Sequence, residues 1–488
     1  MQGKKQYQEK LFTNFHLSDR IPRENFYRRL KEVLPLQWLY KTTKKYYGSE
    51  GQCSIDPVVF FKLMLIGYLE NLGSDRRIIS TVSMRLDMLF FIGYDIDEPL
   101  PWHSTLSRTR QLYGEDIFKE LFRNVLSLCI DKGMVAGKRQ AMDSVYVQAN
   151  ASMESLQRKE VLKDLDNYAN ELSDEEQTFP ADEKKEIQNN NQWSKSLSNH
   201  TLQSTTDKDA RVSVKPGKAR RLNYLAQVSV DTANHVITHI QSDFADKKDS
   251  QCLPSLLDNT INNLNENDLQ VTEVLADGNY SSSEALRALE LKNIEGYIPN
   301  FGQYKSSRKG FEYDKEKDCY ICSQGKVLEY KSIKESHGNG NKMKQYRSKA
   351  KDCSPCPLKN KCIGKSPFKT IAVTIDKELF EKMEHRLQTS KAKRLKKLRS
   401  STVEPVLGTL VNFLGMRRVY TKGISMADKC MLMAGIAYNL KKLLKWEDKK
   451  RQVGAKALPL NIQSVFLMLM GSINALGCYY GLAFKNAD

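Results

Sequence analysis

The chain has 488 residues, with 76 Lys and Arg against 58 Asp and Glu, which gives a formal net charge of +18. A chain of this length has room for about two to four domains. Hydrophobic residues make up 40% of the chain, which excludes disorder throughout. The positive charge favours a polyanionic partner such as DNA, RNA or an anionic membrane, although a merely basic enzyme has the same signature.

The two ends of the sequence give expectations about the cellular location of the protein. Residues 1–6 carry charges with no apolar segment behind them, so we expect no secretory signal or transit peptide and a cytoplasmic protein. Residues 465–484 are nearly continuously apolar, but Ser472, Asn474 and glycines interrupt them. This pattern favours a packing or subunit-contact helix over a membrane span. We therefore expect no membrane partner.

Residues 1–130 are predicted to form a helical domain. Asp56 is a cap before a proline at the first helical position, a second helix follows Ser74, and Ser104 is a candidate cap for a third. Arginines near the starts of such helices suit a helix-turn-helix-like DNA-binding module, although helical bundles with surface arginines are also common without DNA. These residues are Arg76, Arg77, Arg108 and Arg110.

From residue 138 the pattern changes to strands and helices. We predict a strand over 141–147, a polar helical insertion or linker over 153–200, a hairpin at 222–230 and 235–241, a helix from Asp249, a strand at 271–276, a short helix and a strand at 296–299. The predicted fold class is α/β. Residues 138–300 and 376–450 form its two parts, separated by a cysteine-rich segment at 301–375 and followed by an apolar tail at 451–488.

Two aspartates stand at unusual places in these strands. Asp143 lies in the first strand beside Val145 and Val147, where it would lose solvation unless it is paired or binds a cation. Asp277 ends the fourth strand, at the edge where open α/β sheets gather their ligands. An Asp-Gly pair after a strand is also an ordinary turn, so each aspartate taken singly is equally consistent with a structural role.

Glu404 is a third acidic candidate. Its surroundings predict a helix that begins at Ser401 or Thr402, with Pro405 in the first turn. An acidic residue is ordinary there, but six cations lie within residues 391–399 and more follow. A carboxylate among cations suits a metal-dependent enzyme that acts on phosphates, and a solvated basic helix is the alternative. The cations are Lys393, Lys396, Lys397, Arg399, Arg417, Arg418 and Lys422.

Five of the ten cysteines fall between residues 319 and 362, as two Cys-x2-Cys pairs and one further cysteine. In a reducing compartment this spacing favours structural zinc, because one turn can direct two thiolates at a tetrahedral ion. The gap of 30 residues between the pairs and the fifth cysteine leave unliganded thiols as the alternative. The other cysteines are predicted core residues: Cys53, Cys129, Cys252, Cys430 and Cys478.

Several motifs together resemble the DDE transposases of bacterial insertion sequences. They are Met142-Asp-Ser144 with Ala149-Asn-Ala-Ser152, Ala276-Asp-Gly-Asn-Tyr280, Val403-Glu-Pro-Val-Leu-Gly408 and Ala437-Tyr-Asn-Leu440, and in the helical part Asp56-Pro57, Ser74-Asp-Arg-Arg77 and Pro101-Trp-His-Ser-Thr-Leu-Ser-Arg108. The resemblance covers most of the chain. It implies an RNase H-like catalytic domain of mixed sheet and helices, an N-terminal helical domain, and an insertion before the helix that bears the glutamate.

The resemblance implies roles for the acidic residues. Asp143, Asp277 and Glu404 would bind two Mg²⁺ or Mn²⁺ ions about 3.5–4 Å apart, for cleavage and joining of DNA strands by phosphoryl transfer. The implied partners are double-stranded DNA, as the inverted repeats of the element and its target, and at least one further copy of the chain. The protein would then lie on the bacterial nucleoid when bound to DNA.

The resemblance also selects among cysteines and cations. It favours Cys322, Cys353, Cys356 and Cys362 as zinc ligands, with Cys319 as the spare. Many relatives carry a basic residue that contacts the DNA end where this chain has Val411, so we expect Arg399, Arg417, Arg418 and Lys422 to supply that contact. Two alternatives remain: a metal-dependent nuclease of this fold that does not join strands, and a non-catalytic DNA-binding derivative.

Overall fold

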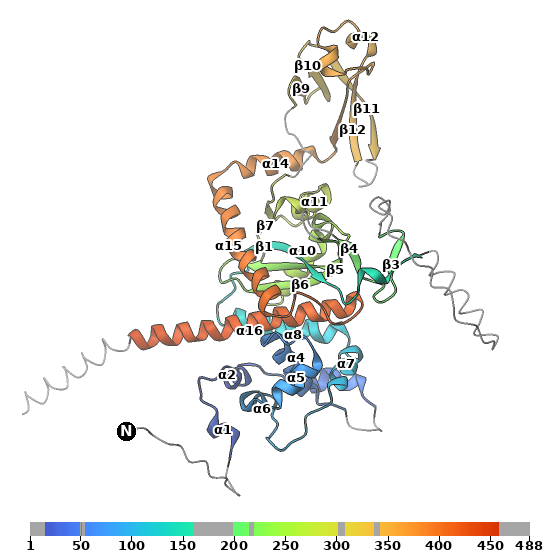
Figure 1. The fold of residues 1–488 in the computed structure, drawn as a ribbon. Coiled ribbons are helices and arrows are strands. Elements are labelled where there is room, and N and C mark those ends of the chain that lie inside the picture. The colour runs from blue at the N-terminus through green and yellow to red at the C-terminus, as the bar shows by residue number, and fades with distance from the viewer. Residues whose placement is uncertain are drawn as a thin grey trace, which may run out of the picture.

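The computed structural model describes residues 15–48, 50, 54–159, 199–213, 219–300, 308–335 and 342–457, with side chains up to residue 450. Within these ranges the chain forms a helical N-terminal region, a six-stranded sheet with helices, and a separate five-stranded sheet (Figure 1). This mixed α/β architecture confirms the predicted fold class. Most of the polar segment, the apolar stretch at 465–484, Cys53 and Cys478 lie outside the described residues.

The N-terminal region is helical, as predicted, and packs around α4 (Pro57–Leu69). Asp56 caps α4 by accepting from the backbone amides of Val58 at 2.7 Å and Val59 at 3.2 Å. Nearly every side chain of α4 is buried, rather than one face of it. The other helices are α1 (Leu17–Arg20), α2 (Phe26–Val33), α3 (Trp38–Thr43), η1 (Lys44–Tyr46), α5 (Asp75–Val82), α6 (Leu86–Ile92), α7 (His103–Leu112) and α8 (Glu115–Asp131).

Two of the predicted helix starts in this region have different outcomes. Helix α5 begins as predicted after Ser74, whose hydroxyl accepts from the Arg77 amide at 3.3 Å. The prediction that Ser104 caps the third helix is wrong, because α7 already begins at His103 and Trp102 precedes it without a side-chain cap. Trp102 is 76% exposed.

The six-stranded sheet has the order β4-β5-β1-β7-β8, and β6 also pairs with β5. Strand β1 is antiparallel to β5 and parallel to β7, which is parallel to β8. The predicted succession of strand, hairpin, helix, strand, helix and strand is confirmed. The elements are β1 (Arg139–Gln148), β4 (Arg211–Ser213), β5 (Arg221–Asp231), β6 (Ile237–Phe244), α10 (Asp249–Asn265), β7 (Glu273–Leu275), η4 (Gly278–Tyr280), α11 (Ser283–Leu291) and β8 (Glu295–Tyr297).

Helices cover both faces of this sheet. Ala141 of β1 belongs to the apolar cluster that includes residues of α4, α8 and the last helix, α16 (Ile424–Ala457). Its neighbour Met142 belongs to a second cluster, with residues of α10 and α11. Successive residues of a strand point to opposite faces, so the sheet is enclosed by two layers. This is why β5 is buried along almost its whole length instead of alternating.

The predicted polar insertion differs from a helix at its described edges. Residues of η2 (Met153–Ser155) lead into β2 (Leu156–Arg158), which pairs with β3 (Leu202–Ser204) as a two-stranded antiparallel ribbon. Residues 160–198 lie outside the described residues.

The cysteine-rich segment folds as a five-stranded antiparallel sheet of order β13-β12-β11-β10-β9. Figure 1 shows it at one end of the molecule, beyond α14 (Lys377–Leu387), which connects it to the body. Its elements are β9 (Phe311–Asp314), β10 (Cys319–Cys322), β11 (Val327–Glu335), β12 (Lys342–Ser348), α12 (Ala350–Cys353), α13 (Lys359–Cys362) and β13 (Thr370–Thr374).

The helix that carries Glu404 begins much earlier than predicted. Helix α15 (Ser390–Phe413) is capped by Thr389, so Glu404 and Pro405 lie in its interior and not in its first turn. The basic run over 391–399 is part of the same helix. Pro405 cannot donate a hydrogen bond to Ser401, but both residues are exposed, so water can reach the free carbonyl. Within the described ranges, no helix is long and apolar enough to cross a membrane.

Candidate functional site

Asp143 and Asp277 come together at the centre of the six-stranded sheet. The parallel register pairs Ala141 of β1 with Leu275, the last residue of β7, so Asp143 within β1 and Asp277 just after β7 each stand two residues beyond this pair. Neighbouring strands lie about 4.8 Å apart. Burial raises the pKa of both carboxyls, and the charge of Asp277 raises the pKa of Asp143 further. The two carboxylates that were predicted from separate motifs therefore share one site.

Arg399 of α15 neutralises part of this acidic site. Its Nη1 atom lies 2.9 Å from Oδ2 of Asp143, and both side chains are largely buried. The positive charge of Arg399 opposes the effect of burial and lowers the pKa of both aspartates. The other oxygen of Asp143 accepts from the Ser144 amide at 2.8 Å. Arg399 was predicted to contact DNA, whereas here it binds a predicted metal ligand.

A third aspartate, which the sequence analysis used only as a helix start, lies beside this pair. Asp249 begins α10, and its charge raises the pKa of Asp277. Its Oδ1 atom accepts from the Gln227 amide at 3.0 Å, and the buried Tyr280 hydroxyl donates to the oxygen of that same amide. The available signal was the position of Asp249 at the first turn of the helix that follows the hairpin.

Glu404 is not part of this group. Its side chain is exposed on α15 and has no hydrogen bond or ion pair with any described residue. Five residues separate it from Arg399, which corresponds to about 7.5 Å along a helix. Among the side chains that the structure describes, no three of the types His, Cys, Asp and Glu are close enough together to hold a metal ion.

The four cysteines predicted to bind zinc lie at one end of the five-stranded sheet without forming a metal group. Cys322 ends β10 at the turn into β11, and β12 runs antiparallel to β11, so β12 ends at the same edge and leads into α12 with Cys353. Cys356 and Cys362 follow. Cys319 is buried three residues before Cys322. The predicted core cysteines Cys129, Cys252 and Cys430 are buried.

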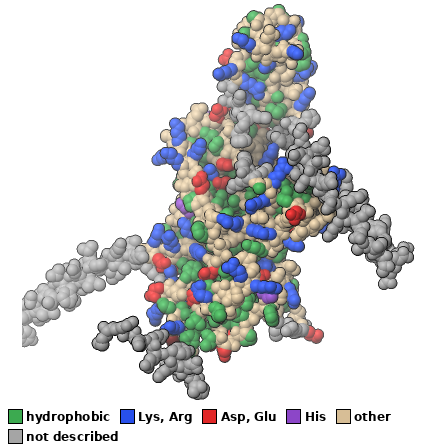
Figure 2. Space-filling model, viewed as in Figure 1, with side chains coloured by type: hydrophobic (Ala, Val, Ile, Leu, Met, Phe, Trp, Pro, Cys, Tyr) green, Lys and Arg blue, Asp and Glu red, His purple; other side chains and the backbone are tan. Residues whose placement is uncertain are grey.

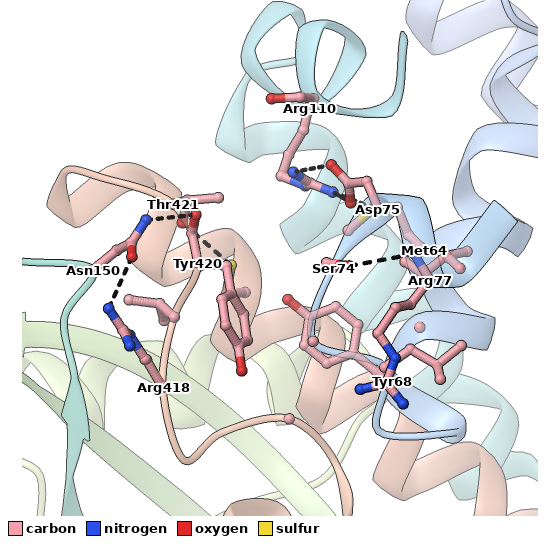
Figure 3. Close-up of a pocket in the computed structure, with 18 of the residues that line it drawn as sticks. Met64, Tyr68, Ser74, Asp75, Arg77, Arg110, Asn150, Arg418, Tyr420 and Thr421 are labelled. Carbon is pink, nitrogen blue, oxygen red and sulfur yellow. Dashed lines mark hydrogen bonds and ion pairs between the residues drawn. The ribbon is translucent and has the colours of Figure 1, made fainter. Parts of the chain in front are cut away.

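The predicted DNA-contact residues are divided between two surfaces. The first surface lies along α15, where Lys393, Lys396 and Lys397 are exposed. The second is a cavity of about 880 Å³ between the N-terminal helices and the connector from α15 to α16. Figure 3 shows Arg77 on one side of this cavity and Arg418 on the other. The predicted contacts that line it are Arg76, Arg77, Arg417, Arg418 and Lys422.

Arg108 and Arg110 have different surroundings. Arg108 is exposed on α7. Arg110 is buried, and its Nη2 atom lies 2.6 Å from Oδ1 of Asp75, so this guanidinium holds α7 against α5. The prediction that Arg110 contacts DNA has no support from this position. Arg108 and Arg110 are two residues apart and so lie on different faces of α7, but the sequence does not show which face packs against the other helices.

The surface as a whole is basic but not evenly so. Figure 2 shows Lys and Arg side chains from the five-stranded sheet to the N-terminal helices, with fewer Asp and Glu between them. This agrees with the net charge of +18. A predominantly positive surface attracts polyanions.

Comparison with known proteins finds two families that match parts of the chain. Residues 15–112 match the family described as "Transposase domain (DUF772)", and residues 321–444 match the family described as "Transposase DDE domain". Two separate parts of the chain therefore match transposase families. The match to the DDE domain includes Glu404 and the four cysteines, and it begins after the segments that carry Asp143 and Asp277.

Two solved structures are similar over long stretches at low identity. A piggyBac transposase synaptic complex with hairpin DNA is 9% identical, with 88% of this chain and 75% of that chain covered and a TM-score of 0.30. The Mos1 transposase paired-end complex with the left transposon end is 12% identical, with 55% and 70% covered and a TM-score of 0.16. Neither score is high enough to define the fold. No curated protein matches the chain significantly.

Proposed function

We propose that the chain is a DNA transposase that binds the ends of an insertion sequence and uses divalent metal ions to cut DNA strands and join them to a target. The observation that carries this proposal is the pairing of Asp143 with Asp277 at matching positions of neighbouring parallel strands. If Asp277 were only a turn residue, there would be no reason for a second carboxylate beside it. Two carboxylates whose charges destabilise each other gain from a shared cation.

The strand arrangement supports an RNase H-like catalytic domain. A three-stranded antiparallel unit of β1, β5 and β6 is extended by β7 and β8, which run parallel to β1. Helices α10 and α11 connect the parallel strands, and α15 lies against β1 and carries Arg399 to Asp143. These are the sheet and the helix that the resemblance predicts for the three acidic residues.

The donor set fits divalent cations. Asp143 already holds the positive guanidinium of Arg399, and burial makes both aspartates costly to keep charged without a cation. Asp143 and Asp277 would hold Mg²⁺ or Mn²⁺, and Glu404, exposed and without a partner among the described residues, would complete the set. Bound ions would activate water or a 3′-hydroxyl and stabilise the leaving oxygen.

The basic side chains of α15 favour a polyanionic substrate. Lys393, Lys396 and Lys397 are exposed on the helix that reaches Asp143 through Arg399, so a DNA backbone on this helix would pass close to the carboxylates. Once a cation neutralises Asp143, Arg399 is free to bind a phosphate. We propose that two copies act together, because two DNA ends must be paired for joining.

The test is a cleavage and strand-transfer assay on the full chain. The DNA substrate carries the sequences that flank the gene, and reactions contain Mg²⁺, Mn²⁺ or EDTA. We expect metal-dependent cuts at the element ends and joining of the cut ends to a plasmid. Asp277→Asn should abolish both steps. Asp258→Asn is the matched control, because this aspartate is exposed on the same catalytic domain and pairs only with Lys292.

The assay separates the proposal from its two rivals. Cleavage without any joined product would identify a nuclease. DNA binding without metal-dependent cleavage would identify a non-catalytic derivative. Full activity of Asp277→Asn would show that the acidic residues are wrongly assigned.

A further inference from the structure

The cavity between the N-terminal helices and the connector from α15 to α16 does not include Asp143, Asp277 or Glu404. About 880 Å³ in volume, it falls in the size range of sites for nucleotide-sized ligands. Helices α4, α5 and α7 form one wall, and residues 415–422 form the other. Figure 3 shows Tyr68, Ser74 and Arg77 from the first wall and Arg418 and Tyr420 from the second.

The cavity is strongly positive. Its only acidic lining residue is Asp75, which the buried Arg110 neutralises at 2.6 Å. None of the five other lining cations forms an ion pair with a carboxylate anywhere in the described chain. Five uncompensated cations facing one cavity repel each other unless an anion binds between them. They are Arg76, Arg77, Arg417, Arg418 and Lys422.

Two guanidinium groups in the cavity wall have donors without partners. The Nε atoms of Arg110 and Arg418 are buried and have no hydrogen-bond acceptor. The Nη2 atom of Arg418 donates to the Asn150 side chain at 3.1 Å, which fixes the orientation of the guanidinium. Buried donors are nearly always satisfied in folded proteins, so an acceptor that enters the cavity is the expected partner.

The cavity also presents an aromatic ring to solvent. Tyr420 is 57% exposed, and its phenol lies so close to Gly73 that a Cβ atom there would stand 2.6 Å from the Tyr420 oxygen. The ring is thus held against the turn before α5. Asn150 donates to the Tyr420 carbonyl at 3.0 Å and anchors the connector beneath it. An exposed, immobilised ring among arginines is the arrangement that stacks unpaired bases.

We infer that this cavity binds an unpaired segment of one DNA strand, with a base against Tyr420 and the flanking phosphates on Arg77 and Arg417. Bases within a duplex are stacked and could not enter a cavity of this size, whereas a nucleotide that leaves the stack can. The inference rests on the proposed function, because it takes DNA as the substrate, and it specifies the form in which the DNA is held.

The cavity is physically connected to the acidic site. Backbone hydrogen bonds join Gln148, the last residue of β1, to Arg417 at 3.2 Å and to Val419 at 2.9 Å. Asp143 lies five residues earlier on the same strand, about 17 Å away. At about 3.4 Å per nucleotide, the unpaired segment would lie about five nucleotides from the position of cleavage.

The test compares the affinity of the full chain for two fluorescent probes by anisotropy: an oligothymidylate of about 12 nucleotides and a duplex of the same length. Tyr420→Ala should weaken single-strand binding about tenfold or more and duplex binding less than about twofold. Tyr420→Phe should retain both affinities. Phe413→Ala is the control, since Phe413 is 64% exposed and does not line the cavity.

A second variant tests the inference in case Tyr420→Ala fails to fold. It leaves all the cations and the Tyr420 ring in the chain. Gly73→Ala should displace Tyr420 and reduce single-strand binding in particular. Equal losses for both probes, or no loss in Tyr420→Ala, would overturn the inference. If the wild-type chain cuts and joins DNA while Tyr420→Ala binds both probes normally, only this inference fails. If the wild-type chain binds neither probe, the proposed function fails as well.

Discussion

In the acidic site, Asp277 is subject to two conflicting effects: cation binding favours its charged form, and burial favours its neutral form. Asp277 has to stay charged to hold a cation, yet burial raises its pKa, with a further increase from Asp249. A group whose pKa is raised on folding stabilises the protein fully below its ordinary pKa and loses that contribution as the pH rises through the raised value. At neutral pH without metal, the charged form of Asp277 is therefore destabilising.

Asp277→Asn should separate the two effects. Because the amide carries no charge, the melting temperature of the metal-free variant should exceed that of the wild type at pH 7, and the difference should shrink at acid pH. DNA cleavage should fall by about a thousandfold or more. Thermal unfolding in EDTA from pH 4 to 8 measures the first effect. A lower melting temperature than the wild type at pH 7 would contradict the conclusion that the charged form of Asp277 destabilises the metal-free protein.

A second polar cavity gives a pH prediction away from the acidic site. Burial lowers the pKa of His239 to about 4, and its neutral ring bonds to Gln241 at 3.2 Å and Asn263 at 3.1 Å. Burial raises the pKa of Asp428, in the same cavity, to about 6. The contribution of His239 to the free energy of unfolding therefore decreases as the pH falls from about 6.5 to 4. The contribution of Asp428 decreases as the pH rises from about 3.8 to 6.

Single substitutions should reveal these opposed effects. The difference in melting temperature between His239→Gln and the wild type should be more positive at pH 4 than at pH 7, because the variant has no histidine whose protonation stabilises the unfolded state. For Asp428→Asn, the difference in melting temperature from the wild type should instead be more positive at pH 7 than at pH 4. Thermal unfolding at both pH values measures it. Parallel shifts in the two variants would show that these groups do not titrate as their burial requires.

At the level of side chains, sequence reasoning was effective where a motif was also a strand position. Asp143 lies in an alternating strand pattern and Asp277 follows an apolar run, and the parallel register brings them together. It was less effective on helices, where the partner face decides the role of a residue. Arg110 and Arg399 were both read as DNA contacts, but one pairs with Asp75 and the other with Asp143. The role of Asp249 depends on a long-range contact that no local pattern encodes.

Among the elements, the five-stranded sheet has a small apolar core of its own. Its cluster of buried apolar residues consists of Tyr320, Leu328, Tyr346 and Ile371. Sheets with so small a core usually need disulfides or a metal. The cysteines in this segment are free, and four of them lie at one end of the sheet, which supports structural zinc as a proposal. The ligands would close the loops that follow β10 and β12.

Zinc should therefore stabilise this sheet in particular. We expect about one equivalent of zinc in the purified chain and preferential proteolysis within 308–374 after chelation or in Cys356→Ser. Cys252→Ser is the control, because Cys252 is buried in α10, far from the sheet in sequence. Mass spectrometry locates the cuts. Absence of zinc together with an unchanged proteolytic pattern after chelation would favour the unliganded thiols.

The boundaries of elements were predictable where a cap or a turn residue sets them. Asp56 and Ser74 begin α4 and α5 as expected, and the hairpin of β5 and β6 lies within a few residues of its prediction. Helix α15 was misplaced because Pro405 looks like a first-turn residue, while the cap that counts is Thr389. An exposed proline inside a long helix leaves no distinguishing mark in the sequence.

For the molecule as a whole, the charge of +18 predicts a steep salt dependence of DNA binding. Arg77→Ala and Arg417→Ala should each reduce the slope of log affinity against log salt by about 0.9 if each arginine holds one phosphate. Lys45→Ala removes the same charge but from an ion pair with Asp116 at 2.8 Å, so its slope should stay unchanged. Equal slopes in all three variants would mean that binding depends on net charge alone.

Helix α16 has a consequence for how proteins of this design diversify. Its buried face belongs to the same apolar cluster as residues of α4 and α8, and Asn439 also bonds the backbone of β6 at 2.9 and 2.8 Å. The N-terminal helices therefore share their core with the last helix of the chain. Recombination could not exchange them as an independent module, because a new N-terminal helical region would have to arrive with a compatible α16.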